Sequence, residues 1–239
     1  MAAEDYGRVP LLPKRTLRRH HVFEPADTRF RAAMRARQAL LREEHGWPMG
    51  EFRTASGRRR QLGNYISPAA AAQGANFITP EIFALARREI AYQEEGALVT
   101  QDRLMRNLLS SAPAVFNVFG ALKLDLKLGT RVLRALCPDF VRDVAAINFE
   151  HSPARRHDAF TADRTAFDVV AKVRTRDNRH GFVGIELKLS ESMCEQPARL
   201  VPVTTTSRAQ PASSKTLTTL LFVPHRLTSF GAFTCFAPR

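Results

Sequence analysis

The most regular alternation of hydrophobic and polar positions in the chain lies between Thr165 and Leu189. In the second half of this stretch, GFVGIELKL, every other residue from the valine onward is aliphatic. Alternation with a period of two predicts a β-strand with one face toward a core. The run TAFDVVAKV comes earlier, and the polar stretch RTRDNRH between the two is typical of a turn. We therefore expect a β-hairpin.

This hairpin places two acidic residues and a lysine on its polar face. With the loop at Thr175 to Arg179, Asp168 falls directly opposite Glu186 on the neighbouring strand, within side-chain reach. Lys188 is two residues beyond Glu186 and therefore shares its face. The pattern predicts two carboxylates and one ammonium group on a single patch of sheet.

Such a patch suits metal-assisted hydrolysis of a phosphodiester bond. Two carboxylates can hold Mg²⁺, or Mn²⁺ in its place, and the metal keeps several waters and also accepts a phosphate oxygen. The metal lowers the pKa of a bound water, and a lysine beside it can orient that water or stabilise the transition state. The alternative is that Glu186 and Lys188 are simply the solvent-facing positions of an amphipathic strand. The spacing alone leaves both interpretations open.

Several segments of the chain, the hairpin among them, resemble segments of one known family. They are FEHSPARR, TADRTAFDVV and GFVGIELKLSE, with EEGALVTQDRLMRNLLSSAPAVFNVFGAL upstream. Together these segments resemble a bacterial family of restriction-type endonucleases within the PD-(D/E)XK nuclease superfamily, over roughly Phe30 to Arg199. Ala112 and Leu189 depart from the family pattern, which has glutamine and tyrosine there. Both departures lie beside the proposed metal ligands and not on them.

The resemblance implies a fold and an activity. The fold is of the α/β class (α+β mixed), with a restriction-endonuclease-like core in which helices precede a central mixed sheet. The activity is Mg²⁺-dependent hydrolysis of phosphodiester bonds in DNA. Asp168 and Glu186 correspond to the metal ligands and Lys188 to the catalytic cation.

A further acidic residue ends the first strand that we expect in the core, Val141 to Phe149. Alternation puts Ala145, Ile147 and Phe149 on one face of this strand, so Glu150 is aimed toward the side of the site. Glu150 is a candidate metal ligand or water-orienting base. Many members of the superfamily also offer an acidic residue from a helix.

Three arginines between the first two strands are candidates for holding phosphates beside the scissile bond: Arg155, Arg156 and Arg164. Either of the first two can instead pair with Glu150, which would then be an ordinary strand-end carboxylate. His151 can assist proton transfer near neutral pH or can be a loop histidine without that duty.

Four segments have the composition and end signals of helices. They are Asp27 to Glu44, Thr79 to Glu95, Thr100 to Leu109, and Ala114 to Leu136 with a break near Gly120 or Gly129. Glu95 is the candidate for the helix-borne acid and Glu94 the second, although both can be ordinary helix-end charges. The many glycines and prolines in residues 45–79 predict loops around Arg58-Arg59-Arg60, which we interpret as a solvated patch.

The net charge of the chain indicates which kinds of molecule it binds. The net charge of +13 over 239 residues favours a polyanion, with nucleic acid as the commonest and an anionic membrane surface as the rival. No apolar run approaches the ~18 residues of a membrane span, and no secretory signal is apparent. The three scattered cysteines predict neither a disulfide framework nor a zinc site. We expect a cytoplasmic protein that does not span a membrane.

The chain divides into three parts by composition. Residues 1–78 form a basic N-terminal arm, a helix and loops, and residues 79–199 form the nuclease-like domain. Residues 200–239 are atypical, because Val201 to Arg239 contain twelve Ser or Thr and none of the 23 acidic residues. This tail is either disordered or the product of a frameshift near Leu200, and in the second case the nuclease core is incomplete at its C-terminus.

Two functions from different classes remain. The first is a metal-dependent DNA endonuclease, for which cutting both strands favours a homodimer. The second is a catalytically inactive or truncated nuclease-fold protein that only binds nucleic acid.

Overall fold

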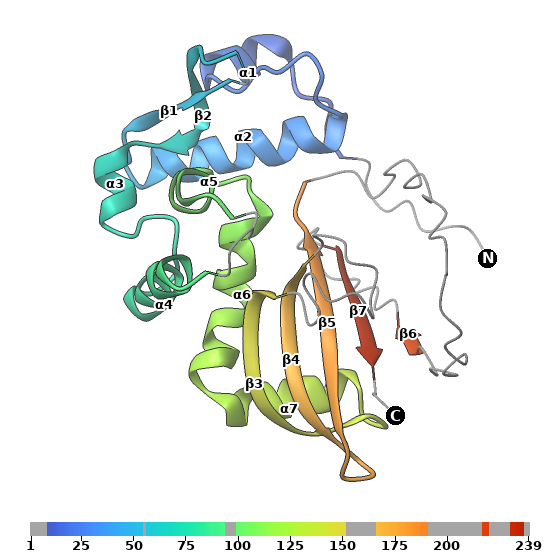
Figure 1. Cartoon of the computed structure of the whole chain (residues 1–239). Coiled ribbons are helices and arrows are strands. Elements are labelled where there is room, and N and C mark those ends of the chain that lie inside the picture. Colours follow the sequence, from blue (N-terminus) through green and yellow to red (C-terminus); the bar gives the residue numbers. More distant parts are fainter. Residues whose placement is uncertain are drawn as a thin grey trace, which may run out of the picture. The chain divides into compact units, whose positions relative to one another are not determined.

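The computed structural model describes residues 9–54, 56–93, 99–151 and 166–190, and the backbone of residues 217–219 and 230–236. The chain forms two compact units that divide within one helix, after Asn117. The first unit contains six helices or parts of helices and a two-stranded sheet, and the second contains a five-stranded sheet with its covering helices (Figure 1). Each unit is described by itself below.

The first unit begins with α1 (Lys14–Arg19), α2 (Arg29–Glu44), β1 (Met49–Arg53) and β2 (Arg59–Ile66). It continues with α3 (Pro68–Ala72), α4 (Pro80–Ala91), α5 (Gln101–Arg106) and the first half of α6 (Ser111–Leu124). Within the basic N-terminal arm, the part from Lys14 is ordered as α1, because Leu17 is buried against Ala36 and Ala39 of α2.

A buried polar network holds the first unit together. Helix α2 begins at the expected place, since Thr28 accepts a hydrogen bond from the third residue of the helix. Arg35 then pairs through Nε with Asp27 at 2.7 Å and donates from Nη1 to Oδ1 of Asn64 at 2.9 Å. Asn64 donates in turn to Asn107 at 2.8 Å. A buried guanidinium is tolerated here because its donors are paired.

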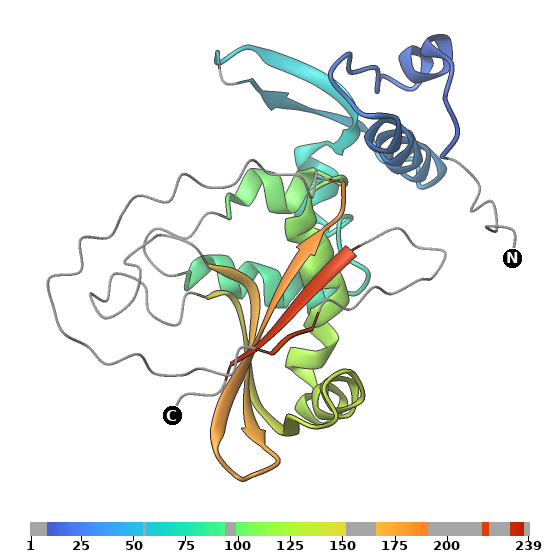
Figure 2. The same ribbon diagram turned by 90° about the vertical axis from the view of Figure 1, so that its right-hand side faces the viewer.

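The prediction of loops throughout residues 45–79 was wrong. Strands β1 and β2 form an antiparallel hairpin, with Arg53 opposite Arg59 (Figure 2). Two glycines that suggested chain breaks are needed for close backbone approach instead. A Cβ at Gly50 would lie 2.1 Å from the carbonyl oxygen of Ile66, and a Cβ at Gly63 would lie 2.1 Å from the carbonyl oxygen of His20.

The predicted helices exist, but four of their boundaries differ. Helix α6 begins at Ser111, before the expected start at Ala114. Helix α4 begins at the expected Thr79 cap and ends at Ala91, before the expected end at Glu95. Helix α5 ends at Arg106, because the backbone of Asn107 is extended. The break in the fourth segment lies at Asp125 and not at a glycine, since the Asp125 carboxylate accepts hydrogen bonds from the first residues of a new helix, α7.

The second unit is a sheet with helices on one face. After the end of α6 come α7 (Leu126–Leu136), β3 (Val141–His151), β4 (Phe167–Thr175), β5 (His180–Lys188), β6 (Leu217–Thr219) and β7 (Phe230–Phe236). The strand order is β3-β4-β5-β7-β6, and each of these described pairings is antiparallel (Figures 1 and 2). The combination of helices and sheet confirms the predicted fold class. The sheet was expected to be mixed, but its described pairings are all antiparallel.

The hairpin of β4 and β5 is confirmed in register. Val169 lies opposite Ile185, and Thr175 donates its N–H to the carbonyl oxygen of Arg179 at 2.9 Å to close the turn. Val183, Ile185 and Leu187 are buried, as their alternation predicted. The face of the sheet that carries these aliphatic side chains is therefore the one that packs into the core.

The expected face assignment in β3 was wrong for one residue. The register of β3 shifts between Val144 and Ala146, which marks a bulge at Ala145. Ala145 is consequently exposed, and Val144 takes its place on the buried face with Ile147 and Phe149. Thr130 of α7 accepts a hydrogen bond from the N–H of Val144 at 2.9 Å, so a helix side chain satisfies a backbone donor beside the bulge.

The C-terminal segment contributes strand β7 along β5 and strand β6 beyond it. The interpretation of residues 200–239 as a disordered or frameshifted tail stays a prediction, because most of these residues lie outside the described part of the chain. Among the helices that the structure describes, none is both long and apolar enough to cross a membrane.

Candidate active site

The strand registers bring three carboxylates into one row across the sheet. Phe149 of β3 and Ile185 of β5 both lie opposite Val169 of β4. One residue further along, the same registers align Glu150, Asp168 and Glu186, and alternation places Asp168 and Glu186 on the outer face, opposite the aliphatic core. The charge of Glu150 acts on Glu186, so Glu150 is close to the pair. The sequence-predicted acids of the three strands are therefore neighbours.

Asp168 is oriented by the neighbouring strand. Its Oδ2 accepts a hydrogen bond from the backbone N–H of Leu187 at 2.7 Å. The backbone pairing of β4 with β5 ends at Val169 and Ile185, and the Asp168 carboxylate serves as the hydrogen-bond acceptor for the N–H of Leu187 beyond that point. A carboxylate has about four acceptor positions, so this bond fixes the group and leaves acceptor capacity for another ligand.

Glu186 has an unusual ionisation. Its pKa is raised from 4.5 to about 7, first because the group is partly buried and second because the negative charge of Asp168 is close. A hydrogen bond with the Asp168 side chain and the charge of Glu150 raise the pKa further, while the charge of Lys188 lowers it. Two carboxylates at hydrogen-bond distance are most stable when they share one proton or one cation.

Lys188 lies on the same face at the end of β5. Its Nζ is 3.8 Å from Oε2 of Glu186, and the two side chains are 34% and 38% exposed. An ion pair of this length at the surface contributes little to stability, roughly 0–1 kcal/mol. The ammonium group is therefore available to a ligand that reaches the carboxylates from solvent.

Glu150 departs from the extended conformation of its strand. Its φ is +48°, in the left-handed region that few non-glycine residues adopt. Such strain costs on the order of 1–3 kcal/mol and is common at functional sites. His151 follows in the last position of β3, opposite Phe167.

Four sequence-predicted residues lie outside the described part of the chain: Glu95, Arg155, Arg156 and Arg164. Their roles stay predictions. The second-choice acid of the helix, Glu94, also lies outside it.

Phe167 lies near the carboxylates, and no pattern in the sequence predicted this position. The ring of Phe167 lies over Gly184, because a Cβ on that glycine would come within 2.8 Å of the ring. The ring is also 6.4 Å from the ring of Phe182. Gly184 is two residues before Glu186 on the same strand face, so the Phe167 ring covers sheet surface directly beside the carboxylates.

The carboxylate pair fits a hard divalent cation, although it is not a complete metal cage. Among the described residues, no group of three or more His, Cys, Asp or Glu side chains is arranged to hold a metal ion. Mg²⁺ does not need one, because it keeps several waters and is commonly held by one or two carboxylates together with substrate phosphates. Asp168 and Glu186 supply these two carboxylates, and their mutual repulsion is what a cation would relieve.

A family model described as the PD-(D/E)XK nuclease superfamily matches residues 25–217. The chain belongs to the PD-(D/E)XK nuclease superfamily. Membership implies nucleic acid as the substrate and a hydrolase acting on phosphodiester bonds, and nucleases of this superfamily generally use divalent metals. No curated protein and no solved structure is significantly similar to the chain. The match continues past Leu200, into the segment interpreted as a tail.

The raised pKa of Glu186 predicts how the stability of this superfamily member changes with pH. The folded state binds the proton more tightly than the unfolded state, so the free energy of unfolding falls as pH rises from about 4.5 to about 7. Glu186→Gln removes this penalty and is expected to stabilise the metal-free protein at pH 8 by about 1–2 kcal/mol. This is about half of what the full shift would give at 1.36 kcal/mol per pKa unit, because the side chain is more than a third exposed.

Thermal unfolding in EDTA at pH 4.5 and pH 8 measures this effect. The two proteins should unfold at nearly the same temperature at pH 4.5, with the variant higher at pH 8. An equal difference at both pH values would contradict the raised pKa.

Proposed function

We propose that this protein is a metal-dependent endonuclease that hydrolyses phosphodiester bonds in DNA. The observation that carries the proposal is the arrangement of Asp168, Glu186 and Lys188. Two carboxylates share a hydrogen bond on the outer face of the sheet, and an ammonium group lies 3.8 Å from one of them. The same three positions correspond to the superfamily motif.

The three side chains have distinct roles in the proposed reaction. Asp168, oriented by the Leu187 N–H, and Glu186 hold Mg²⁺ or Mn²⁺. When bound, the metal supplies an acidified water and a positive charge beside the scissile phosphate. Lys188 orients the attacking water or stabilises charge that develops on the phosphate oxygens. Glu150 is a third acid in the same row, suited to orient the water.

The pKa of Glu186 couples this site to pH. Near neutral pH without metal, the carboxyl of Glu186 is about half protonated. A cation must displace that proton, so metal affinity is expected to rise with pH through about 7. The proposed nuclease is therefore more active above neutral pH than below it.

A second candidate is a protein that binds nucleic acid through its surface and cuts nothing. The net charge of +13 favours this function as much as the first. The two candidates differ in whether the carboxylate row is used.

Plasmid cleavage tests the proposal. Purified protein is incubated with supercoiled DNA in Mg²⁺, in Mn²⁺ and in EDTA, and nicked and linear products are measured over time. We expect products with either metal and none in EDTA. Folded protein that binds the plasmid without cutting it in either metal would support the second candidate. Direct appearance of linear product would support a homodimer that cuts both strands.

A further inference from the structure

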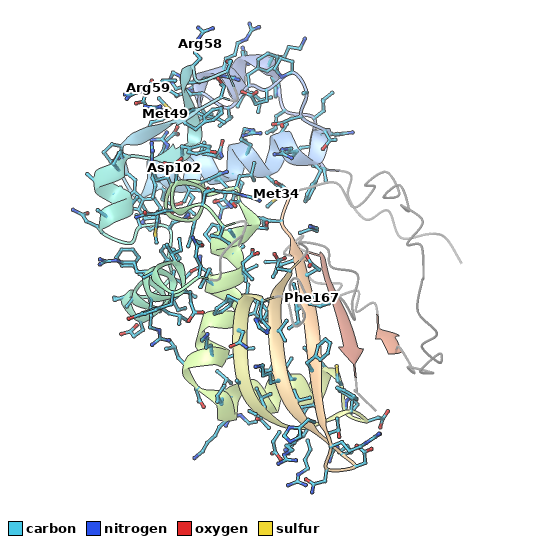
Figure 3. All side chains as sticks on the ribbon, in the orientation of Figure 1. Met34, Met49, Arg58, Arg59, Asp102 and Phe167 are labelled. Atoms are coloured by element: carbon cyan, nitrogen blue, oxygen red, sulfur yellow. The ribbon has the colours of Figure 1, made fainter. Side chains whose placement is uncertain are left out.

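The hairpin of β1 and β2 in the first unit ends in a concentration of arginines. Residues 53–60 contain four of them: Arg53, Arg58, Arg59 and Arg60. The tip is closed by a hydrogen bond from the N–H of Thr54 to the carbonyl oxygen of Arg58 at 2.9 Å, and Gly57 turns the chain with a φ of +80°. Figure 3 shows Arg58 and Arg59 at this end of the hairpin, with side chains that extend into solvent.

Only part of this charge is neutralised within the first unit. Two arginines pair with carboxylates, Arg59 with Glu51 at 3.0 Å and Arg60 with Glu24. Arg53 and Arg58 are exposed and form no hydrogen bond or ion pair through their side chains within the described residues. The tip therefore keeps two uncompensated guanidinium groups, one at the end of β1 and one just before β2.

The pairing of the strands makes this charge costly for folding. Arg53 lies directly opposite Arg59 in the antiparallel register, and like charges in that position destabilise a sheet by a few tenths of a kcal/mol or more. The Glu51 carboxylate relieves this repulsion in part, and its side chain is itself 42% exposed. Stability of the hairpin gives no reason for Arg53 or Arg58, which points to a partner that these two side chains bind.

The chemistry of the tip favours nucleic acid over a membrane. Guanidinium groups bind phosphates with two parallel hydrogen bonds, and a two-stranded ribbon is of a size that enters the major groove of DNA. A membrane-binding tip would need large apolar side chains beside the arginines. The residues between Arg53 and Arg58 are Thr, Ala, Ser and Gly, which are small. Phe52 is only partly exposed and stacks on the Tyr65 ring at 5.1 Å.

We propose that the β1–β2 hairpin is a nucleic-acid-binding arm in which Arg53 and Arg58 contact phosphates. This arm belongs to the first unit and shares no residue with the carboxylate row of the second unit. The inference rests on the proposed function only in the choice of DNA as ligand. The test below measures DNA binding without cleavage, so the binding-arm proposal and the endonuclease proposal can fail independently.

The test compares the binding of a 30-base-pair fluorescent duplex in EDTA by wild type and by the double variant Arg53→Ala/Arg58→Ala. Each lost phosphate contact reduces the slope of log K against log salt by about 0.9. We expect the variant to lose about two units of slope and about tenfold or more in affinity near 100 mM salt. Arg53→Lys/Arg58→Lys, which keeps the charge, should retain most of the slope.

The matched control is Lys127→Ala/Arg131→Ala, which removes two exposed positive charges from α7. It should change the affinity less than twofold and leave the slope intact. The proposal is overturned if the folded arginine variant binds DNA as wild type does, if both double variants lose the same affinity, or if wild type does not bind. It is also overturned if the arginine variant loses binding only to phosphatidylserine vesicles. Cleavage activity enters none of these outcomes.

Discussion

Lys188→Ala is expected to lower the rate of metal-dependent DNA cleavage by about 10²- to 10³-fold, in the range typical of losing one group that stabilises transition-state charge. The fold should survive, because Lys188 is one-third exposed and its contact with Glu186 at 3.8 Å is weak. The variant should also bind metal at least as well as wild type, since an ammonium group beside the carboxylates opposes cation binding. Single-turnover cleavage and Mn²⁺ titration measure the two properties separately.

The sheet itself offers a matched control for this change. Lys172 of β4 is exposed on the same face of the sheet as Asp168, and its partner in β5 is Phe182, away from the carboxylate row. Lys172→Ala removes the same charge and should leave the cleavage rate within about threefold, as expected of a contact to DNA and not to the reacting phosphate. If both variants lose activity equally, Lys188 has no special role and the catalytic assignment is wrong.

Asp168→Asn is expected to reduce cleavage by about 10³-fold or more, because it removes a ligand and with it the metal chemistry. The asparagine side chain keeps the shape and can still accept the hydrogen bond from the Leu187 N–H, so the hairpin should remain folded. The change also removes the negative charge that raises the pKa of Glu186. That pKa should fall toward its ordinary value, and metal affinity should become less dependent on pH while it weakens.

Isothermal titration with Mn²⁺ at pH 6 and pH 8 checks this prediction together with cleavage assays. Asp143→Asn is the control, since Asp143 lies in β3 and its ion pairs within the described residues are surface pairs with Arg134 and Arg142. Wild-type metal affinity in Asp168→Asn would show that the ligand assignment is incorrect.

The central hairpin and the positions of its carboxylates could be predicted because they depend on residues that are close together in the sequence. Asp168 and Glu186 are eighteen positions apart, and the register between them depends only on the turn and on a two-residue alternation. The cap residues Thr28 and Thr79 located the starts of two helices for the same reason.

The features that were missed depend on contacts distant in sequence. Gly50 and Gly63 resemble chain breakers in sequence, and only the approach of Ile66 and His20 explains them as strand residues. The bulge at Ala145 is accompanied by a hydrogen bond from its neighbour to a helix side chain. The position of the Phe167 ring over Gly184 likewise depends on packing across strands and leaves no periodic trace.

The turn from Thr175 to Arg179 determines the site without touching it. It contains three residues between its closing pair, and it alone sets which residue of β5 faces Asp168. If one residue were added or removed and the register of β5 shifted with it, Glu186 and Lys188 would turn to the aliphatic face. Ile185 or Leu187 would then lie opposite Asp168. Surface turns usually tolerate insertions and deletions during evolution. Here the length of an exposed loop should be under the same selection as the metal ligands. Substitutions in this loop would then be neutral, whereas insertions and deletions would not.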